Sequence, residues 1–275
     1  AAGCPVVVKA NRAHPGCAEL VGEAVRKAAE ACKLPPGVFS LLHGASHELN
    51  LRLVRHPAAK AAGFTGSLGG GRALFDAAAS RPDPIPVFAE MGSVNPVFVL
   101  PGALAERGDA IAEGLKGSVT LGNGQFCTKP GVVAGLRGPA FEALVRKLGL
   151  LIGQQAPGTM LHPGIQKSYE EGLSSFGAVA GARCVAKSAT PADRARTQVE
   201  AAVFETDAAV FLKERRLREE VFGPASLAVH CGTRAELEAV ARALDGHLTA
   251  TIQGTEADLR EHAGLLAILE ERVGR

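Results

Sequence analysis

A lone cysteine, Cys127, lies in a segment rich in glycine and turn-forming residues, positions 122–131. The segment leads into the apolar run 132–134, which we expect to form a strand. A nucleophilic thiol needs such a setting, with an exposed sulfur on a turn, free backbone N–H groups beside it and a rigid strand behind it. Cysteine is also a common small buried hydrophobic residue, so a packing role is the alternative. The pattern makes Cys127 a candidate nucleophile.

Two carboxylates and one glycine-rich turn could assist such a thiol. Glu90 lies in a predicted strand at 87–92, and Glu220 closes a charged run at 214–220. Taken alone, each carboxylate is better explained as a solvated charge. The turn at 66–71 lies between a predicted strand and a predicted helix, where free N–H groups and small residues favour a bound phosphate. The turn is not a complete GxGxxG motif, so tight packing is its alternative role.

The elements that position these residues alternate between strand and helix. Lys9 ends the first predicted strand, at the carboxyl edge where α/β folds bind ligands, although a solvated strand end is the simpler interpretation. Such alternation predicts a parallel sheet with right-handed crossovers. In the first part of the chain we expect strands at 6–10, 38–42 and 61–65 and helices from 15, at 48–54 and at 72–79. The run 6–10 has the β-branched pattern of a buried strand.

A second alternation follows the proline-rich link at 82–86. We expect strands at 87–92, 95–100, 131–136, 198–206, 226–230 and 248–252, and helices at 104–121, 139–150, 163–176, 234–244 and 256–271. The fold class is therefore α/β, with a Rossmann-like parallel-sheet domain over residues 1–92 and a second α/β domain over residues 93–275. The segment 190–196 is the best candidate for an exposed loop.

Composition excludes several classes of function. Lys and Arg number 30 against 28 Asp and Glu, so no charge excess directs the chain to nucleic acid or to an anionic membrane. No apolar run is long enough to span a bilayer. The six cysteines form no Cys-x-x-Cys pair and the eight histidines give no convincing ligand pair, so we expect no metal site, no disulfide framework and a cytoplasmic location.

Four segments together resemble the aldehyde dehydrogenase superfamily. They read Phe-Cys-Thr-Lys-Pro-Gly around Cys127, Phe-Thr-Gly-Ser ending at Ser67, Glu-Met-Gly-Ser-Val-Asn-Pro starting at Glu90, and Glu-Val-Phe-Gly-Pro starting at Glu220. The cysteine segment is most similar to the branch that oxidises 2,5-dioxopentanoate (α-ketoglutarate semialdehyde) and to its NADP-dependent fatty-aldehyde relatives. The resemblance covers essentially every residue of the chain but only the middle of the family's sequence, so we expect an internal fragment with both domains incomplete.

The resemblance implies a role for each motif. Cys127 is the nucleophile and Glu90 the base that activates water, with apolar surroundings raising the pKa of its carboxyl. Gly66 and Ser67 contact the pyrophosphate of NADP or NAD, with Met91 and Gly92 also at the cofactor. Glu220 holds the nicotinamide ribose and Phe222 packs beside the ring. Lys9 binds the adenosine ribose or its 2′-phosphate, and the neutral Asn11 removes repulsion against that phosphate, so NADP is expected to be accepted.

The expected activity is oxidation of a small aldehyde or semialdehyde, with 2,5-dioxopentanoate giving 2-oxoglutarate as the foremost case. The family's second oxyanion donor and its oligomerisation strands lie outside these residues, so we expect a homo-oligomer for the full-length protein and impaired activity for this chain alone. The alternatives are a fatty-aldehyde or other semialdehyde dehydrogenase, and a non-catalytic truncated fold that binds a nucleotide or a partner. An acylating enzyme that transfers its thioester to coenzyme A is a further alternative, and the presence of Glu90 counts against it.

Overall fold

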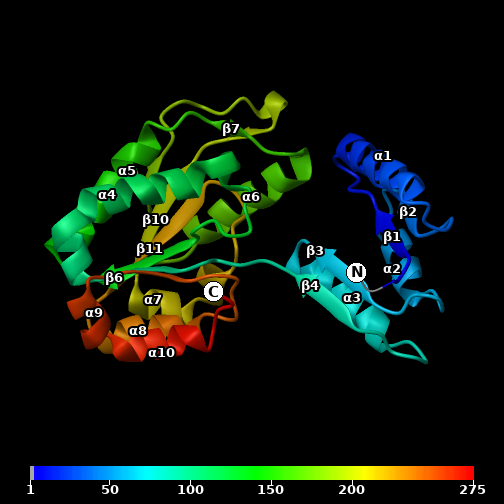
Figure 1. Cartoon of the computed structure of the whole chain (residues 1–275). Helices are drawn as coiled ribbons and strands as arrows, with labels where there is room; N and C mark the ends of the chain where they lie inside the picture. The colour runs from blue at the N-terminus through cyan, green and yellow to red at the C-terminus, as the bar shows by residue number, and fades with distance from the viewer. Residues whose placement is uncertain (1–2) are drawn as a thin grey trace. The chain divides into compact units, whose positions relative to one another are not determined.

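The chain folds into two compact units. The computed structural model describes residues 3–275, of which the first unit ends at Met91 and the second covers Gly92–Arg275. Figure 1 shows the first unit in blue to cyan and the second in green to red. Within residues 3–275, no helix is both long enough and apolar enough to cross a membrane.

The first unit consists of two separate pairs of parallel strands with three helices. β1 pairs with β2, and β3 pairs with β4. A small apolar core forms around Leu74 and Ala78 of α3 and Val54 of α2. The elements are β1 (Val6–Lys9), α1 (Pro15–Ala31), β2 (Phe39–Leu42), α2 (His47–Arg55), β3 (Ala62–Thr65), α3 (Leu68–Ala79) and β4 (Val87–Glu90).

The expectation that the first strand is buried is wrong. Val6 and Val7 of β1 are 51% and 55% exposed. The strand has a single neighbour, β2, and α1 buries only Gly22, so one pair of strands and one helix leave much of β1 uncovered. The β-branched sequence predicts the strand correctly, but burial depends on neighbours that the local pattern does not specify.

The second unit is a six-stranded sheet covered by helices. Its strand order is β12-β5-β6-β11-β10-β8, and all neighbours are parallel except β8, which runs antiparallel to β10. The strands and helices are β5 (Val97–Val99), α4 (Pro101–Thr120), β6 (Val132–Leu136), α5 (Pro139–Gly153), β7 (Gly158–Thr159), α6 (Pro163–Gly177), β8 (Ala182–Lys187), β9 (Gln198–Val199), β10 (Ala202–Asp207), α7 (Ala208–Lys213), β11 (Ala225–Cys231), α8 (Arg234–Ala243), β12 (Thr251–Gln253), α9 (Glu256–Glu261) and α10 (Ala263–Glu270). Three 3-10 helices join them, η1 (Leu121–Gly124), η2 (Arg194–Arg196) and η3 (Arg215–Arg218).

The two faces of this sheet bury different apolar clusters. Phe98 of β5 and Val132 of β6 belong to the cluster that includes residues of α6, α7, α8 and α10. Their neighbours Val97 and Val133 belong to the cluster beneath α4 and α5. Side chains of a strand alternate between faces, so short apolar strands can fill both cores at once. Figure 1 shows α4 and α5 on one side of the sheet and α8 and α10 on the other.

Several element boundaries differ from the sequence prediction. α3 begins at Leu68 rather than at 72, because the Ser67 side chain accepts a hydrogen bond from the Gly70 N–H and caps the helix. α4 begins at Pro101 rather than at 104, since proline suits the first helical turn. The predicted helix at 256–271 is two helices, α9 and α10, joined at His262.

The predicted strand at 198–206 is two strands with different partners. β9 pairs with β7, whereas β10 enters the main sheet between β11 and β8. The sequence analysis did not predict β7, β8 or α7. β8 is an edge strand with an exposed, partly polar sequence, so it lacks the apolar run that marks a buried strand.

Candidate active site

Cys127 lies on an exposed turn between η1 and β6. The Lys129 N–H donates to the Phe126 carbonyl at 3.1 Å, which places Cys127 second in a four-residue turn. The thiol is exposed, so it is not a small buried hydrophobic residue. In the part of the chain that the structure describes, the Cys127 N–H donates to no protein group. The turn therefore presents a sulfur and a free N–H donor together.

The backbone before the turn packs directly on a second motif. Gly122, Asn123 and Gly124 all have positive φ, and a Cβ added at Gly124 would lie 2.2 Å from the carbonyl carbon of Gly223. Such contact of backbone on backbone leaves no room for a side chain. These glycines allow the loop to pack against the segment that follows Glu220.

A buried asparagine supports the turn from below. Asn95 is 2% exposed, and its Nδ2 donates to the carbonyls of Cys127 at 2.8 Å and of Lys129 at 3.0 Å. Its Oδ1 accepts from the Ser93 hydroxyl at 2.7 Å and from the Thr249 hydroxyl at 3.2 Å. Asn95 was not predicted from the sequence as a site residue. Its φ of 44° is one that asparagine tolerates better than most residues.

Glu220 belongs to the same assembly. Its Oε1 accepts from the Ser93 N–H at 3.3 Å, and a Cβ added at Gly92 would lie 2.6 Å from its Oε2. Burial raises the pKa of Glu220, while the Ser93 N–H and the positive charge of Lys129 act in the opposite direction. The structure thus brings together Gly92, Glu220 and the Cys127 turn. Phe222, two residues further on, is half-buried.

Lys129 is the buried charge of this assembly. Its side chain is 3% exposed, and Nζ donates to the carbonyls of Val221 at 3.1 Å and of Ala225 at 2.8 Å. Burial lowers the pKa of Lys129 to about 8, and the charge of Glu220 only partly compensates. From the sequence, Lys129 was noted only as part of the motif around Cys127, and nothing in the local sequence indicates that it is buried.

Exposed apolar side chains stand beside the nucleophile. Phe126 is 46% exposed and Leu161 is 50% exposed. Gln125 joins their segments, since its Oε1 accepts from the Leu161 N–H at 2.8 Å and its Nε2 donates to the Thr159 carbonyl at 3.3 Å. Neither apolar residue was predicted to belong to the site.

The glycine-rich turn of the first unit lies at the carboxyl end of the β3–β4 pair. The Gly66 N–H donates to the Glu90 carbonyl at 3.0 Å, so the turn and the predicted base lie on adjacent strands. Ser67 caps α3, whose first N–H groups, those of Leu68 and Gly69, donate to no described protein group. Free N–H groups at a helix start are suited to a phosphate.

Other predicted ligands in the first unit have distinct local settings. The Met91 sulfur packs at the start of α3, where a Cβ added at Gly71 would lie 2.5 Å from it. Lys9 ends β1 and is partly exposed. Asn11 is exposed and its Oδ1 accepts from the Ala13 N–H at 2.9 Å, which tightens the turn after β1.

The predicted base is not enclosed by apolar groups. Glu90 ends β4 and is exposed, because successive residues of this strand alternate between half-buried and exposed. The expected apolar surroundings are therefore not observed. Glu90 belongs to the first unit and Cys127 to the second, so the surroundings of each residue are given within its own unit.

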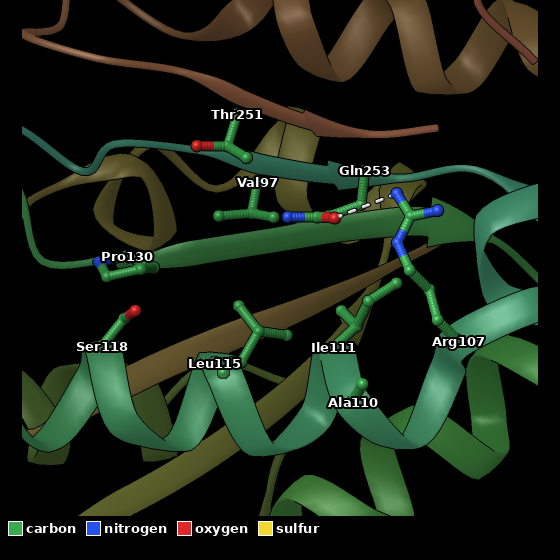
Figure 2. A pocket seen from close by; sticks show the side chains of 10 residues that line it. Val97, Arg107, Ala110, Ile111, Leu115, Ser118, Pro130, Thr251 and Gln253 are labelled. Carbon is green, nitrogen blue, oxygen red and sulfur yellow. Dashed lines mark hydrogen bonds between the residues drawn. The ribbon is translucent and has the colours of Figure 1, made fainter. Parts of the chain in front are cut away.

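Two hollows of the second unit are separate from Cys127. One, of about 300 Å³, lies between α4 and the β5–β12 edge, and Figure 2 shows Arg107 reaching across it to Gln253. The other, of about 550 Å³, is lined by residues at the carboxyl ends of β10 and β11, among them Asp207 and His230. Cys127 instead precedes β6, so the nucleophile is at the amino edge of these parallel strands.

The model of the aldehyde dehydrogenase family matches residues 1–263. The chain belongs to the aldehyde dehydrogenase family.

Two named relatives align with this aldehyde dehydrogenase chain over all of its residues, but each relative is longer. The chain is 46% identical over 275 residues to alpha-ketoglutaric semialdehyde dehydrogenase 2 of Azospirillum brasilense. The alignment covers 100% of this chain and 52% of that protein. It is 42% identical over 276 residues to alpha-ketoglutaric semialdehyde dehydrogenase of Acinetobacter baylyi, again covering 52% of the relative. The chain thus spans about half the length of these relatives.

Solved structures share the aldehyde dehydrogenase fold. An NAD-dependent aldehyde dehydrogenase from Sinorhizobium meliloti matches with a TM-score of 0.83 at 25% identity, over 99% of this chain and 53% of that one. An NAD-dependent benzaldehyde dehydrogenase from Corynebacterium glutamicum matches with a TM-score of 0.79 at 22% identity, over 98% and 56% of the two chains. The predicted α/β fold class, and its incomplete extent relative to the family, are confirmed.

Proposed function

We propose that this protein contributes the nucleophile and most of the cofactor site of an enzyme that oxidises an aldehyde to a carboxylate. The observation that carries the proposal is the Cys127 turn, which exposes a thiol, keeps its own N–H free and packs its backbone against the Glu220 motif. We assign residues 1–92 to the cofactor domain and residues 93–275 to the catalytic domain.

The chemistry follows from these groups. The Cys127 thiolate adds to the aldehyde carbon, and the free Cys127 N–H donates to the oxygen that becomes negative. Loss of hydride from the resulting thiohemiacetal carbon leaves a thioester on Cys127. Through its motif we assign Glu90 the role of the base, which accepts a proton from the water that attacks the thioester and releases the carboxylate and the thiol. Aldehyde, water and oxidised cofactor thus give carboxylate, reduced cofactor and two protons.

The residues present fit a nicotinamide dinucleotide, which supplies the hydride acceptor when bound. The free N–H groups that open α3 suit its pyrophosphate, with Gly66 and Ser67 at the turn. Glu220 is a half-buried carboxylate that can accept hydrogen bonds from a ribose, and Phe222 follows two residues later. We assign Met91 and Gly92 to the same cofactor through their motif.

We infer that NADP is accepted, and preferred to NAD. The turn after β1 carries Asn11 rather than an acidic residue, and Arg12 next to it is exposed without an ion-pair partner among the described residues. Lys9 adds a second positive charge at this strand end. A 2′-phosphate would meet two cations and no carboxylate from these residues. Equal or better kcat/KM with NAD would overturn this preference.

The substrate that we propose is 2,5-dioxopentanoate, with 2-oxoglutarate as product. Two relatives that are 46% and 42% identical to the chain carry the name alpha-ketoglutaric semialdehyde dehydrogenase, which supports this choice. A fatty aldehyde or another semialdehyde is the second candidate, favoured by the exposed apolar Phe126 and Leu161 beside the nucleophile. The intact enzyme is proposed to be a cytoplasmic homo-oligomer.

A burst assay on the intact enzyme tests the reaction. A short ω-oxo acid is mixed with NADP, and reduced cofactor is followed by absorbance. Cys127→Ala should abolish the signal, whereas Glu90→Gln should keep a burst of about one equivalent and slow the steady state. The exposed Cys184, replaced by alanine, is the matched control and should leave both phases unchanged. Full turnover by Glu90→Gln would refute its role as the base.

A further inference from the structure

Lys129 carries a buried ammonium group whose charge is not required for packing. Its ammonium is buried two residues after the nucleophile, and the described chain offers no carboxylate within ion-pair distance. Burying an ammonium is costly, and a methionine of similar length would fill the same space without that cost. The charge is therefore retained against a penalty.

The acceptors of this ammonium lie on both sides of the motif that faces the nucleophile loop. Val221 and Ala225 supply the two carbonyls, and between them lies Gly223, against which Gly124 packs. Asn95 holds the carbonyls of Cys127 and Lys129 themselves. The turn is thus fixed in two ways: its carbonyls accept from the Asn95 amide, and its own Lys129 ammonium donates to the carbonyls of Val221 and Ala225.

The ammonium also bears on the carboxylate next to this segment. Glu220 precedes Val221, and Lys129 is the charged side chain that favours its ionised form, while the Ser93 N–H adds a hydrogen bond to the same carboxylate. Glu220 is in turn the charged side chain that favours the protonated form of Lys129. Each charge offsets part of the desolvation of the other.

We propose that Lys129 is a positioning residue that locks the Cys127 turn to the 220–225 segment and keeps Glu220 ionised for the cofactor. This inference rests on the proposed function and names a further part of the same site. Lys129 acts through Glu220 and through the carbonyls of Val221 and Ala225, and does not itself react with substrate.

The test is the pH dependence of cofactor binding to the intact enzyme. Lys129→Met removes charge and donors, and Lys129→Gln removes the charge but keeps donors. The exposed Lys213, replaced by methionine, is the matched control from the same unit. NADP binding is measured by calorimetry, and turnover is measured in parallel.

Without the lysine charge, Glu220 binds a proton at higher pH. We expect both Lys129 variants to bind NADP about tenfold more weakly at slightly acidic pH. The deficit of Lys129→Gln should shrink as the pH rises through about 8, where the wild-type lysine loses its own proton, whereas Lys129→Met, which also lacks the donors, should keep part of its deficit. Affinity in Lys213→Met should match the wild type throughout. A loss in Lys129→Gln that does not change with pH, or no loss in either variant, would overturn the inference.

A double-mutant cycle separates this role from a general loss of structure. In a Glu220→Gln background the charge at residue 129 has nothing to act on, so Lys129→Gln should add less than about a twofold loss of NADP affinity. Additive losses would overturn the coupling. The cycle measures binding without turnover, so its result does not depend on the activity test of Cys127→Ala. If Cys127→Ala is active, the proposed function is refuted. If Cys127→Ala is inactive but the Lys129 and Glu220 losses are additive, only the role of Lys129 is refuted.

Discussion

The buried Lys129 predicts a specific dependence of stability on pH. Burial lowers the pKa of Lys129 from 10.5 to about 8, so between these values the unfolded chain binds a proton that the folded chain has lost. Stability then rises with pH, because the cost of the buried charge is fully present below about pH 8 and is relieved as pH increases through that value. Lys129→Met removes the titrating group and should remove this rise.

The size of the effect follows from the two pKa values. With pKa values of about 8 folded and 10.5 unfolded, the unfolding free energy of the wild type rises by about 1 kcal/mol between about pH 7 and about pH 9 relative to Lys129→Met. The exposed Lys213, replaced by methionine, should not change the pH dependence of the wild type.

Tyrosine fluorescence during denaturant unfolding measures this difference in the second unit. Tyr169 is the only tyrosine of the chain, there is no tryptophan, and its side chain is 1% exposed in α6. Burial raises the pKa of Tyr169, so the folded-state signal does not titrate in the range used. A difference between wild type and Lys129→Met that stays constant with pH, or that falls as pH rises, would refute the placement of a charged lysine in this core.

Three further predictions concern the loop, an acid-sensitive histidine and the cofactor. Gly124→Ala should cost about 1–3 kcal/mol of stability and lower kcat, because its Cβ would meet the Gly223 backbone. Gly117→Ala is the control and should do neither, because a Cβ there lies in open space on α4. Thermal unfolding and initial rates measure both variants. Burial lowers the pKa of His247 below 6.5, although the charge of Asp245 acts in the opposite direction. As the pH drops below 6.5 the unfolded state therefore binds a proton before the folded state does, and the unfolding free energy falls. His247→Asn should make this fall smaller, as measured by denaturant titrations at several pH values. Asn11→Glu should lower kcat/KM for NADP about tenfold while sparing NAD, and an unchanged ratio would contradict the assigned phosphate position.

Local sequence predicted the parts of the site that local geometry builds. Cys127 is exposed on a turn because neighbouring residues form that turn. The cap that Ser67 makes by accepting from the Gly70 N–H is equally local, but it was missed, and the helix was predicted to start at 72. The contacts of Asn95 and Lys129 could not be predicted in this way, because their acceptors lie 32 to 34 and 92 to 96 positions away in the chain. Only the order of the strands brings those carbonyls to the loop.

Dependence on segments that are distant in the chain also explains why the expected burial of β1 and the expected apolar surroundings of Glu90 are not observed. The β-branched residues of β1 predict a strand, yet whether Val6 is covered depends on how many strands and helices flank it. Glu90 was expected among apolar groups because of its motif, and the alternation of β4 leaves it exposed. Periodicity identifies elements more reliably than it identifies what covers them.

Covalent trapping tests the central claim, that Cys127 is the nucleophile, most directly. The intact Glu90→Gln enzyme is mixed with a short ω-oxo acid and NADP, quenched in acid and digested, and the peptides are weighed by mass spectrometry. The proposal predicts an acyl group on the peptide that contains Cys127, released by hydroxylamine as a thioester would be. Oxidation of the aldehyde with no acyl group on Cys127 at any time would contradict it.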